Sequence, residues 1–130
     1  MIETETCIFA PQKKTKRLIM AIVHTSKIEF EIGLDENKVP EKIVWNAEDG
    51  GLGKAETKSF MLSVWDPKKK DTLRIDLWTK DMPVDEMKQF FHQTLVSMSH
   101  TFERATNDEK MGETMRDFCD YFEEKLDLKK

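Results

Sequence analysis

The segment from Thr72 to Thr106 constrains the fold more than any other part of the chain. Residues 72–79 alternate apolar and polar side chains, which is the period of a β-strand with one exposed face. From residue 84 onward the apolar positions recur at intervals of three or four, which is the period of an amphipathic α-helix. A strand that runs directly into a long helix indicates an α+β domain.

Other stretches of the chain supply the remaining strands of the expected sheet. Residues 26–34 alternate in the same way, and residues 41–47 resume after turn residues at 35–40, so the two runs predict a β-hairpin. Residues 48–54 are rich in glycine and predict a flexible connection. The first residues of 55–66 suit the start of a helix and the later ones suit a strand. We favour a strand, which would form a second hairpin with 72–79.

Two helices are expected after the strands. Asp81 and Pro83 predict the start of the first helix, which should run to about residue 105. Its apolar stripe consists of Val84, Met87, Phe91, Leu95, Met98 and Phe102. Residues 106–108 predict a break and a new cap, and the stripe of the second helix consists of Met111, Met115, Phe118, Phe122 and Leu126. We therefore predict an α+β fold, with an antiparallel sheet of about four strands in two hairpins and two C-terminal antiparallel helices packed on one sheet face.

Length and composition limit the class of protein. A chain of 130 residues suits one domain, and we expect it at residues 24–130, after a poorly structured extension at 1–23. The net charge of -4 argues against binding to nucleic acid. No apolar run approaches the roughly 18 residues of a membrane-spanning helix, so we predict no membrane insertion. The two cysteines, Cys7 and Cys119, do not form a disulfide pattern and fit the reducing cytoplasm.

The N-terminal extension leaves two alternatives open. Basic residues at 13–17 precede a six-residue apolar run at 18–23, which superficially resembles a signal peptide. That run is shorter than the 7–15 residues typical of such a segment, so secretion is the minor interpretation. Met20 is as good a candidate for the translation start as Met1, and residues 1–19 would then be an extension with little structure.

No catalytic or metal-binding motif is found in the sequence. Asp85, His92 and Ser99 are spaced by seven residues, or about 10 Å along a helix, which is too far for direct proton transfer. His92 is better explained as a residue between core and solvent, and Cys119 as a core residue. The histidines and cysteines lack the spacing of a metal site, and the glycines at 50–53 lack the spacing of a phosphate loop. We predict no enzyme activity, no metal and no cofactor.

Tryptophan and arginine side chains indicate a protein-binding surface. If the apolar residues of 72–79 face the helices, Trp78 lies on the opposite sheet face with Arg74 and Asp76, and Trp65 joins them from the neighbouring strand. Tryptophan and arginine are enriched at protein interfaces. A structural role, in which Trp78 folds under the loops, is weighed slightly above a role in an interface. A sheet face that is half apolar also suits a homodimer.

A family resemblance supplies a functional hypothesis. The sequences TLRIDLWTKDMPVDEMKQFFHQTL, TFERAT and MRDFCDYFEEKL resemble the gliding motility protein GldC family of Bacteroidetes, and SKIEFEIGLDENKVPEKIVWNA is similar to the N-terminal hairpin of that family. The resemblance covers about residues 24–127. It implies a small cytoplasmic accessory protein of surface gliding, in bacteria whose gliding is tied to type IX secretion. It implies no enzyme activity and no set of functional residues.

Our first hypothesis is therefore a non-catalytic protein that binds another protein of the gliding machinery. The alternative is a small-ligand-binding domain, or a weakly marked enzyme, with a pocket between sheet and helices. A third option, a nucleic-acid binder that uses the lysines at 68–70 and the basic tail, is disfavoured by the acidic body of the chain.

Overall fold

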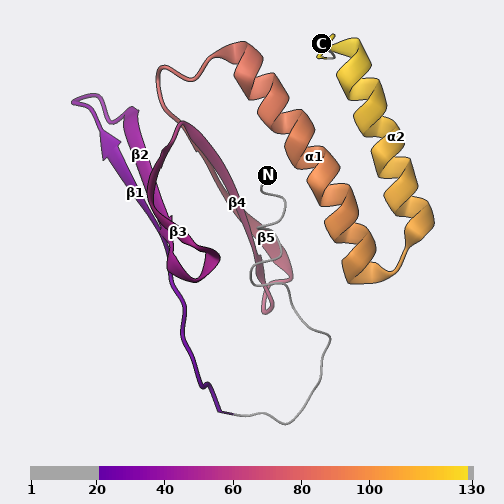
Figure 1. Cartoon of the computed structure of the whole chain (residues 1–130), viewed down its shortest axis with the longest axis horizontal. Helices are drawn as coiled ribbons and strands as arrows, with labels where there is room; N and C mark the ends of the chain where they lie inside the picture. The colour runs from indigo at the N-terminus through magenta and orange to yellow at the C-terminus, as the bar shows by residue number, and fades with distance from the viewer. Residues whose placement is uncertain (1–20, 129–130) are drawn as a thin grey trace. The chain divides into compact units, whose positions relative to one another are not determined.

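A computed structural model of the chain describes residues 21–128. In chain order they form β1 (Ile28–Leu34), β2 (Pro40–Ala47), the 3-10 helix η2 (Glu48–Gly50), β3 (Leu52–Thr57), β4 (Ser59–Asp66), β5 (Asp71–Trp78), α1 (Val84–Thr106) and α2 (Glu109–Lys125) (Figure 1). The chain divides between Met82 and Pro83 into two compact units. The sheet unit contains the strands, and the helix unit contains α1 and α2.

Strands β1, β2 and β3 form an antiparallel sheet with β2 in the centre. The turn between β1 and β2 is held by Asp35. Its Oδ1 atom accepts hydrogen bonds from the backbone N–H groups of Asn37 and Val39, at 2.8 and 3.0 Å. Aspartate commonly closes a turn by binding backbone groups a few residues ahead. The predicted first hairpin is therefore present, and its turn residues explain it.

The core of the sheet unit lies on one face of β2. Ile43 is completely buried and Ala47 is nearly so. Phe30 of β1 stacks on Trp45 of β2, with ring centroids 5.8 Å apart, and on Phe60 of β4, with centroids 4.3 Å apart. Aromatic pairs contribute about 0.5–1.5 kcal/mol beyond the area that they bury. Because Phe60 belongs to the other sheet, the Phe30 ring connects the two sheets.

Strands β4 and β5 form a separate two-stranded antiparallel ribbon. Their pairing runs without a bulge from Ser59 opposite Trp78 to Asp66 opposite Asp71. Asp66 closes the turn at the tip, where its Oδ1 atom accepts a hydrogen bond from the Lys68 N–H at 3.0 Å. An isolated two-stranded ribbon is at best marginally stable in water. The contacts at the base of the ribbon are therefore important.

Residues 79–81, here called the clasp, fasten the base of the ribbon to the three-stranded sheet. The Thr79 N–H donates to the carbonyl oxygen of Lys58 at 2.8 Å, and the Lys80 N–H donates to that of Pro40 at 3.0 Å. Thr79 is only 3% exposed, and its hydroxyl donates to Asp81 Oδ1 at 2.6 Å. The clasp thus reaches both the junction between β3 and β4 and the start of β2.

Three ion pairs reinforce the clasp, the longest of which joins Lys80 Nζ to Glu41 Oε1 at 3.8 Å. Lys80 Nζ lies 2.6 Å from Asp35 Oδ2, and Lys58 Nζ lies 2.8 Å from Asp81 Oδ2. The hydrogen bond from Lys80 is the main reason that the pKa of Asp35 falls from 3.8 to about 2. The bond from Lys58 is likewise the main reason that the pKa of Asp81 falls to about 2. Both carboxylates are bound more favourably in their charged form.

The start of α1 differs from the prediction. Pro83, in an extended conformation, precedes the first helical residue, Val84, and no side chain caps this end of the helix. Asp81, the predicted capping residue, binds the Thr79 hydroxyl and the Lys58 ammonium group instead. The predicted role of Asp81 as a cap is therefore wrong, because Thr79 and Lys58 orient its carboxylate within the clasp and no side chain accepts a hydrogen bond from the first turn of α1.

The predicted break between the helices is confirmed. Asn107 follows α1 in the left-handed conformation, with φ of 61°, and its N–H donates to the Glu103 carbonyl oxygen at 2.8 Å. Asp108 caps α2, since its Oδ1 atom accepts a hydrogen bond from the Met111 N–H at 3.0 Å. Asparagine tolerates positive φ, and aspartate is a preferred N-cap. These two residues reverse the direction of the chain, so the helices run antiparallel (Figure 1).

Small residues lie where α1 and α2 meet. Within the described part of the helix unit, the buried residues are Ser99 on α1 and Gly112 and Cys119 on α2. A Cβ atom at position 112 would lie 2.7 Å from Glu103 Oε1, so glycine leaves room for this carboxylate. Cys119 packs in the interior as predicted, and burial raises the pKa of its thiol.

A polar network crosses between the two helices. The Arg116 NH2 group donates to Glu103 Oε1 at 2.7 Å, and its NH1 group lies 3.5 Å from the hydroxyl of Ser99. The side chains of Arg116 and Glu103 are 28% and 29% exposed. Removal of one member of a largely buried ion pair is costly because the other charge is left without a partner. The network therefore favours one register of α1 against α2.

The apolar stripes predict the helices correctly but form only part of the contact between them, where the Phe122 ring of α2 stacks on the His92 ring of α1. Phe91 and Met98 on α1, and Met111 and Phe118 on α2, are exposed. The helices also meet beside the stripes, at Ser99 and its small partners, because small side chains allow the closest approach. The expected packing of the helices on one sheet face stays a prediction.

The predicted fold class is confirmed, since antiparallel sheets precede two C-terminal helices in an α+β arrangement. The strand count differs: the described residues form five strands in two sheets, where about four in one were expected. The missed strand is β3, whose sequence LGKAET has low intrinsic preference for a strand. It is held by antiparallel pairing with β2. The expectations about residues 1–19 and Met20 lie outside the described residues.

The pKa of Asp35 leads to a prediction about acid stability. Its folded value of about 2 lies below the ordinary 3.8, so the unfolded chain takes up the proton first as pH falls. The stabilisation is therefore complete above about pH 4 and is lost as pH falls toward 2. We expect Asp35→Asn to lower the urea midpoint at pH 7 and to make its decline below pH 4 shallower. Glu36→Gln removes the same charge from the same turn and is the control; equal midpoints for the two variants would contradict the prediction.

The space at Gly112 leads to a second prediction. Gly112→Ala should destabilise the native chain by about 1–2 kcal/mol, although alanine is the better helix former, because the new methyl group displaces Glu103 from Arg116. In a Glu103→Ala background the same change should cost at least about 1 kcal/mol less. Urea unfolding of the four chains measures this difference. Gly53→Ala, where a Cβ atom meets nothing within 4 Å, is the control. Equal costs in both backgrounds would show that displacement of the Glu103 carboxylate is not the cause, because the Cβ atom of residue 103, 3.2 Å from the new methyl group, is present in both.

Candidate functional site

The register of the β4–β5 ribbon determines which side chains share a face. Residues directly opposite each other in an antiparallel pair point to the same side, and so does every second residue along a strand. The four predicted interface residues, Trp65, Arg74, Asp76 and Trp78, therefore lie on one face. We call it the tryptophan face. Its residues are Ser59, Met61, Ser63 and Trp65 on β4 and Thr72, Arg74, Asp76 and Trp78 on β5.

The two tryptophans lie at opposite ends of this face. Trp65 is opposite Thr72 beside the tip, and Trp78 is opposite Ser59 at the base. Six residues of β5 separate these two positions, which corresponds to about 20 Å along a strand. Trp65 is 62% exposed and Trp78 is 54% exposed. The two indole rings thus form separate anchor points rather than one aromatic cluster.

A charged network occupies the middle of the tryptophan face. The Arg74 guanidinium donates to both carboxylate oxygens of Asp76, from Nε at 3.2 Å and from NH2 at 2.6 Å. Its NH1 group also donates to the hydroxyl of Ser63 on the neighbouring strand. Three hydrogen bonds therefore hold the arginine in one conformation. A side chain that is ordered before binding loses less entropy when a partner arrives.

The opposite face of the ribbon is apolar. It carries three directly opposed pairs, Phe60 with Leu77, Leu62 with Ile75, and Val64 with Leu73. Leu73 and Ile75 are exposed, whereas Phe60 and Leu77 at the base are partly buried. The alternation predicted from residues 72–79 is therefore confirmed as a division into one apolar face and one face of mixed character.

Three lysines form the tip of the ribbon. Lys68, Lys69 and Lys70 are exposed, and within the part of the chain that the structure describes they take part in no ion pair. Asp66 binds the backbone of this turn. The turn is thus a local basic site on an acidic protein, beside Trp65.

The structure does not bring His92 together with Ser99 and Asp85. The His92 ring stacks on Phe122, with centroids 6.2 Å apart, and is partly buried. Ser99 donates its hydroxyl hydrogen to the Val96 carbonyl oxygen at 2.7 Å. Among the described residues, no hydrogen bond joins His92 to Ser99 or Asp85. Ser99 is instead part of the contact between the helices.

Across residues 21–128, no group of three or more His, Cys, Asp or Glu side chains is arranged to hold a metal ion. None of the helices in that range has the length and apolar character needed to cross a membrane.

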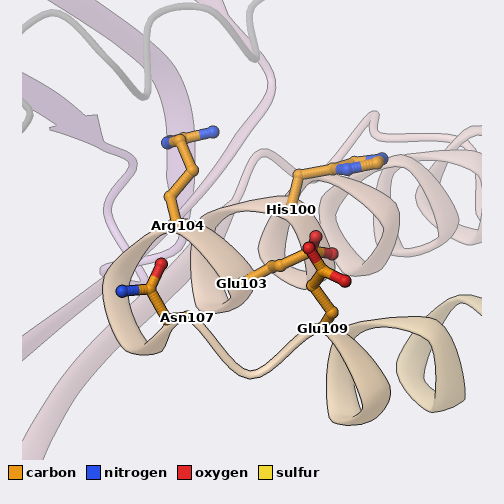
Figure 2. Close-up of a pocket in the computed structure, with 5 residues that line it drawn as sticks. All are labelled: His100, Glu103, Arg104, Asn107 and Glu109. Carbon is orange, nitrogen blue, oxygen red and sulfur yellow. The ribbon is translucent and has the colours of Figure 1, made fainter.

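A pocket of about 350 Å³ lies at the turn between α1 and α2 (Figure 2). Its lining residues are His100, Glu103, Arg104, Asn107 and Glu109. Figure 2 shows the carboxylates of Glu103 and Glu109 pointing toward each other, while Arg104 extends away from them. Glu103 is already bound by Arg116, which also lies 3.4 Å from His100 Nδ1. The lining is polar and of mixed charge, as suits a small polar ligand rather than an apolar one.

Sequence reasoning did not find the polar network beside this pocket. Glu103 and Arg116 lie on different helices, and no spacing rule connects them. Gly112 was the available signal, because glycine inside a helix costs about 1 kcal/mol relative to alanine and often marks a close approach. The four residues of the predicted interface, by contrast, follow directly from the alternation of two strands.

A comparison with known protein families shows which family the chain is related to. The family described as gliding motility-associated protein GldC-like matches residues 40–128. The match contains β2 to β5, both helices and the whole tryptophan face, whereas β1 lies outside it. No curated protein and no solved structure matches the chain. Because the family match covers well over half of the sequence, the chain belongs to the GldC-like family of gliding motility-associated proteins.

Proposed function

We propose that this protein is a non-catalytic accessory component of bacterial gliding. It acts in the cytoplasm by binding, and thereby stabilising, another protein of the gliding or type IX secretion machinery. Membership of the GldC-like family supports the association with gliding. The resemblance to the GldC family implies no enzyme activity, and this supports a role in binding rather than in chemistry.

The tryptophan face is the observation that carries the proposal. Tryptophan and arginine are the residue types that most often dominate protein–protein binding energy. Both tryptophans are more than half exposed, and Arg74 is held in place by Asp76 and Ser63. Burial of large side chains whose surroundings are already ordered yields affinity at low entropic cost. The face therefore has the composition and the rigidity of a binding surface.

The pocket at the turn between α1 and α2 favours a second candidate function, the binding of a small polar ligand. Glu103 and Glu109 would receive a cationic group, and His100 and Arg104 would contact polar or anionic groups. Native mass spectrometry of protein purified from its own cells tests this candidate. A bound small molecule that is lost in a Glu109→Ala variant would support it.

Replacement of Trp78 by alanine tests the main proposal. We expect Trp78→Ala to weaken binding to a machinery protein by at least about tenfold, since loss of an anchoring tryptophan costs about 2 kcal/mol or more. The change should lower the free energy of unfolding by less, because the side chain is 54% exposed. The partner is first identified by affinity purification from gliding cells with mass spectrometry, and its affinity for each variant is then measured with purified proteins.

Leu73→Ala is the matched control for this experiment, because Leu73 is also about half exposed but lies on the apolar face of the same ribbon. The control should retain partner binding. If Trp78→Ala unfolds the protein, or binds the partner as well as the native chain does, the tryptophan face is not the binding surface.

A further inference from the structure

The tryptophan face has a tryptophan at each end and a charged residue on either side of its middle, whether it is followed from the tip or from the base of the ribbon. Each pair of directly opposed residues on β4 and β5 is here called a rung. From tip to base, the rungs of the tryptophan face are Trp65 with Thr72, Ser63 with Arg74, Met61 with Asp76, and Ser59 with Trp78. Each outer rung holds one exposed tryptophan and one hydroxyl residue. The two inner rungs hold charges of opposite sign. A surface with this pattern is complementary to itself when it is turned end for end.

We infer that the tryptophan face binds the same face of a second copy of the chain, in a two-fold symmetric dimer with antiparallel ribbons. The inference rests on the proposed function, which takes this face to be a protein-binding surface, and it names one occupant. The two-fold axis lies in the interface, perpendicular to the strands, and passes between the two inner rungs. This symmetry places the tip of each ribbon on the base of the other. Arg74 of each copy then lies over Asp76 of the other, and Trp78 lies over the rung that holds Trp65.

The charges in the middle have spare hydrogen-bonding capacity for this contact. Arg74 uses three of the five N–H donors of a guanidinium, on Asp76 and Ser63. The carboxylate of Asp76 accepts two bonds, although a carboxylate has about four acceptor sites. Each group can therefore bind its counterpart on the second copy without losing its bonds within the chain. Four charges of alternating sign would meet at the centre of the interface.

The same charges select the antiparallel arrangement. If two ribbons met tip to tip, the Ser63–Arg74 pair of one copy would face the same pair of the other, and the Met61–Asp76 pair would face its counterpart, so charges of one sign would lie close together. Like charges brought together across an interface cost several kcal/mol. The antiparallel arrangement removes this repulsion and replaces it with attraction.

The size of the face indicates a weak dimer. An eight-residue, two-stranded ribbon is about 27 Å long and about 10 Å wide, or roughly 270 Å². Stable complexes bury about 800 Å² on each partner. The dimer should therefore form reversibly at high protein concentration, and a machinery protein that uses the same face would compete with it.

Charge reversal in two separate chains tests the inference. Sedimentation equilibrium over a range of concentrations measures self-association of the native chain and of the variants Arg74→Glu and Asp76→Arg. Each variant alone should self-associate at least about tenfold more weakly, because like charges then face each other. An equal mixture of the two variants should regain native affinity, since the acidic centre of one copy faces the basic centre of the other.

The mixture separates an intermolecular contact from a structural role. Both single variants also break the Arg74–Asp76 pair within the chain, and mixing cannot repair an internal defect. Arg104→Glu, which makes the same charge change on α1, is the control and should self-associate as the native chain does. Trp65→Ala, at the exposed tip, should weaken the dimer even if a charge variant fails to fold.

Two results would overturn the dimer: a native chain that stays monomeric at the highest concentration, or a mixture that associates no better than the single variants. If Trp78→Ala still loses the machinery protein in either case, the proposed function stands and only the dimer is wrong. If Trp78→Ala retains that protein as well, both are wrong.

Discussion

The clasp is the constraint on which the sheet unit depends. A two-stranded ribbon has too few neighbours to be stable by itself, yet β4 and β5 carry the whole tryptophan face. The clasp compensates by joining the base of the ribbon to β2, to the β1–β2 turn and to the β3–β4 junction through two backbone hydrogen bonds and three ion pairs. The stacking of Phe30 on Phe60 adds an apolar contact between the two sheets. Contacts at the base of the ribbon thus position the candidate binding surface.

The helix unit follows a different principle of packing. Its two helices carry apolar stripes, but they meet through Ser99, Gly112 and Cys119 and through the pair formed by Glu103 and Arg116. A polar pair at this position gains little energy after its desolvation, but it disfavours other registers, in which a charge would be buried alone. The arrangement leaves Phe91, Met98 and Phe118 exposed. Small residues thus bring the helices together, and the ion pair fixes their alignment.

A binding role and self-association are compatible on one surface. Tryptophans at the two ends provide apolar anchors, and the charged centre provides orientation. An interface as small as one ribbon face would release its second copy readily, so that a larger partner surface could replace it. The family relationship connects the chain with gliding. The proposal that the tryptophan face binds a machinery protein gives that connection a location that mutation can test.

The sequence by itself determined the features that depend on local periodicity. Alternation in 72–79 predicted β5 and its two faces, and spacings of three and four predicted α1 and α2, because side-chain direction within one element depends only on backbone geometry. The four residues of the candidate interface were placed on one face for the same reason. Only the tertiary structure decided features that join distant parts of the chain. β3 is a strand because β2 pairs with it. Asp81 is part of the clasp rather than a helix cap because Lys58 binds it. Gly112 is needed because Glu103 approaches it from another helix. Each of these depends on a partner that no local pattern specifies.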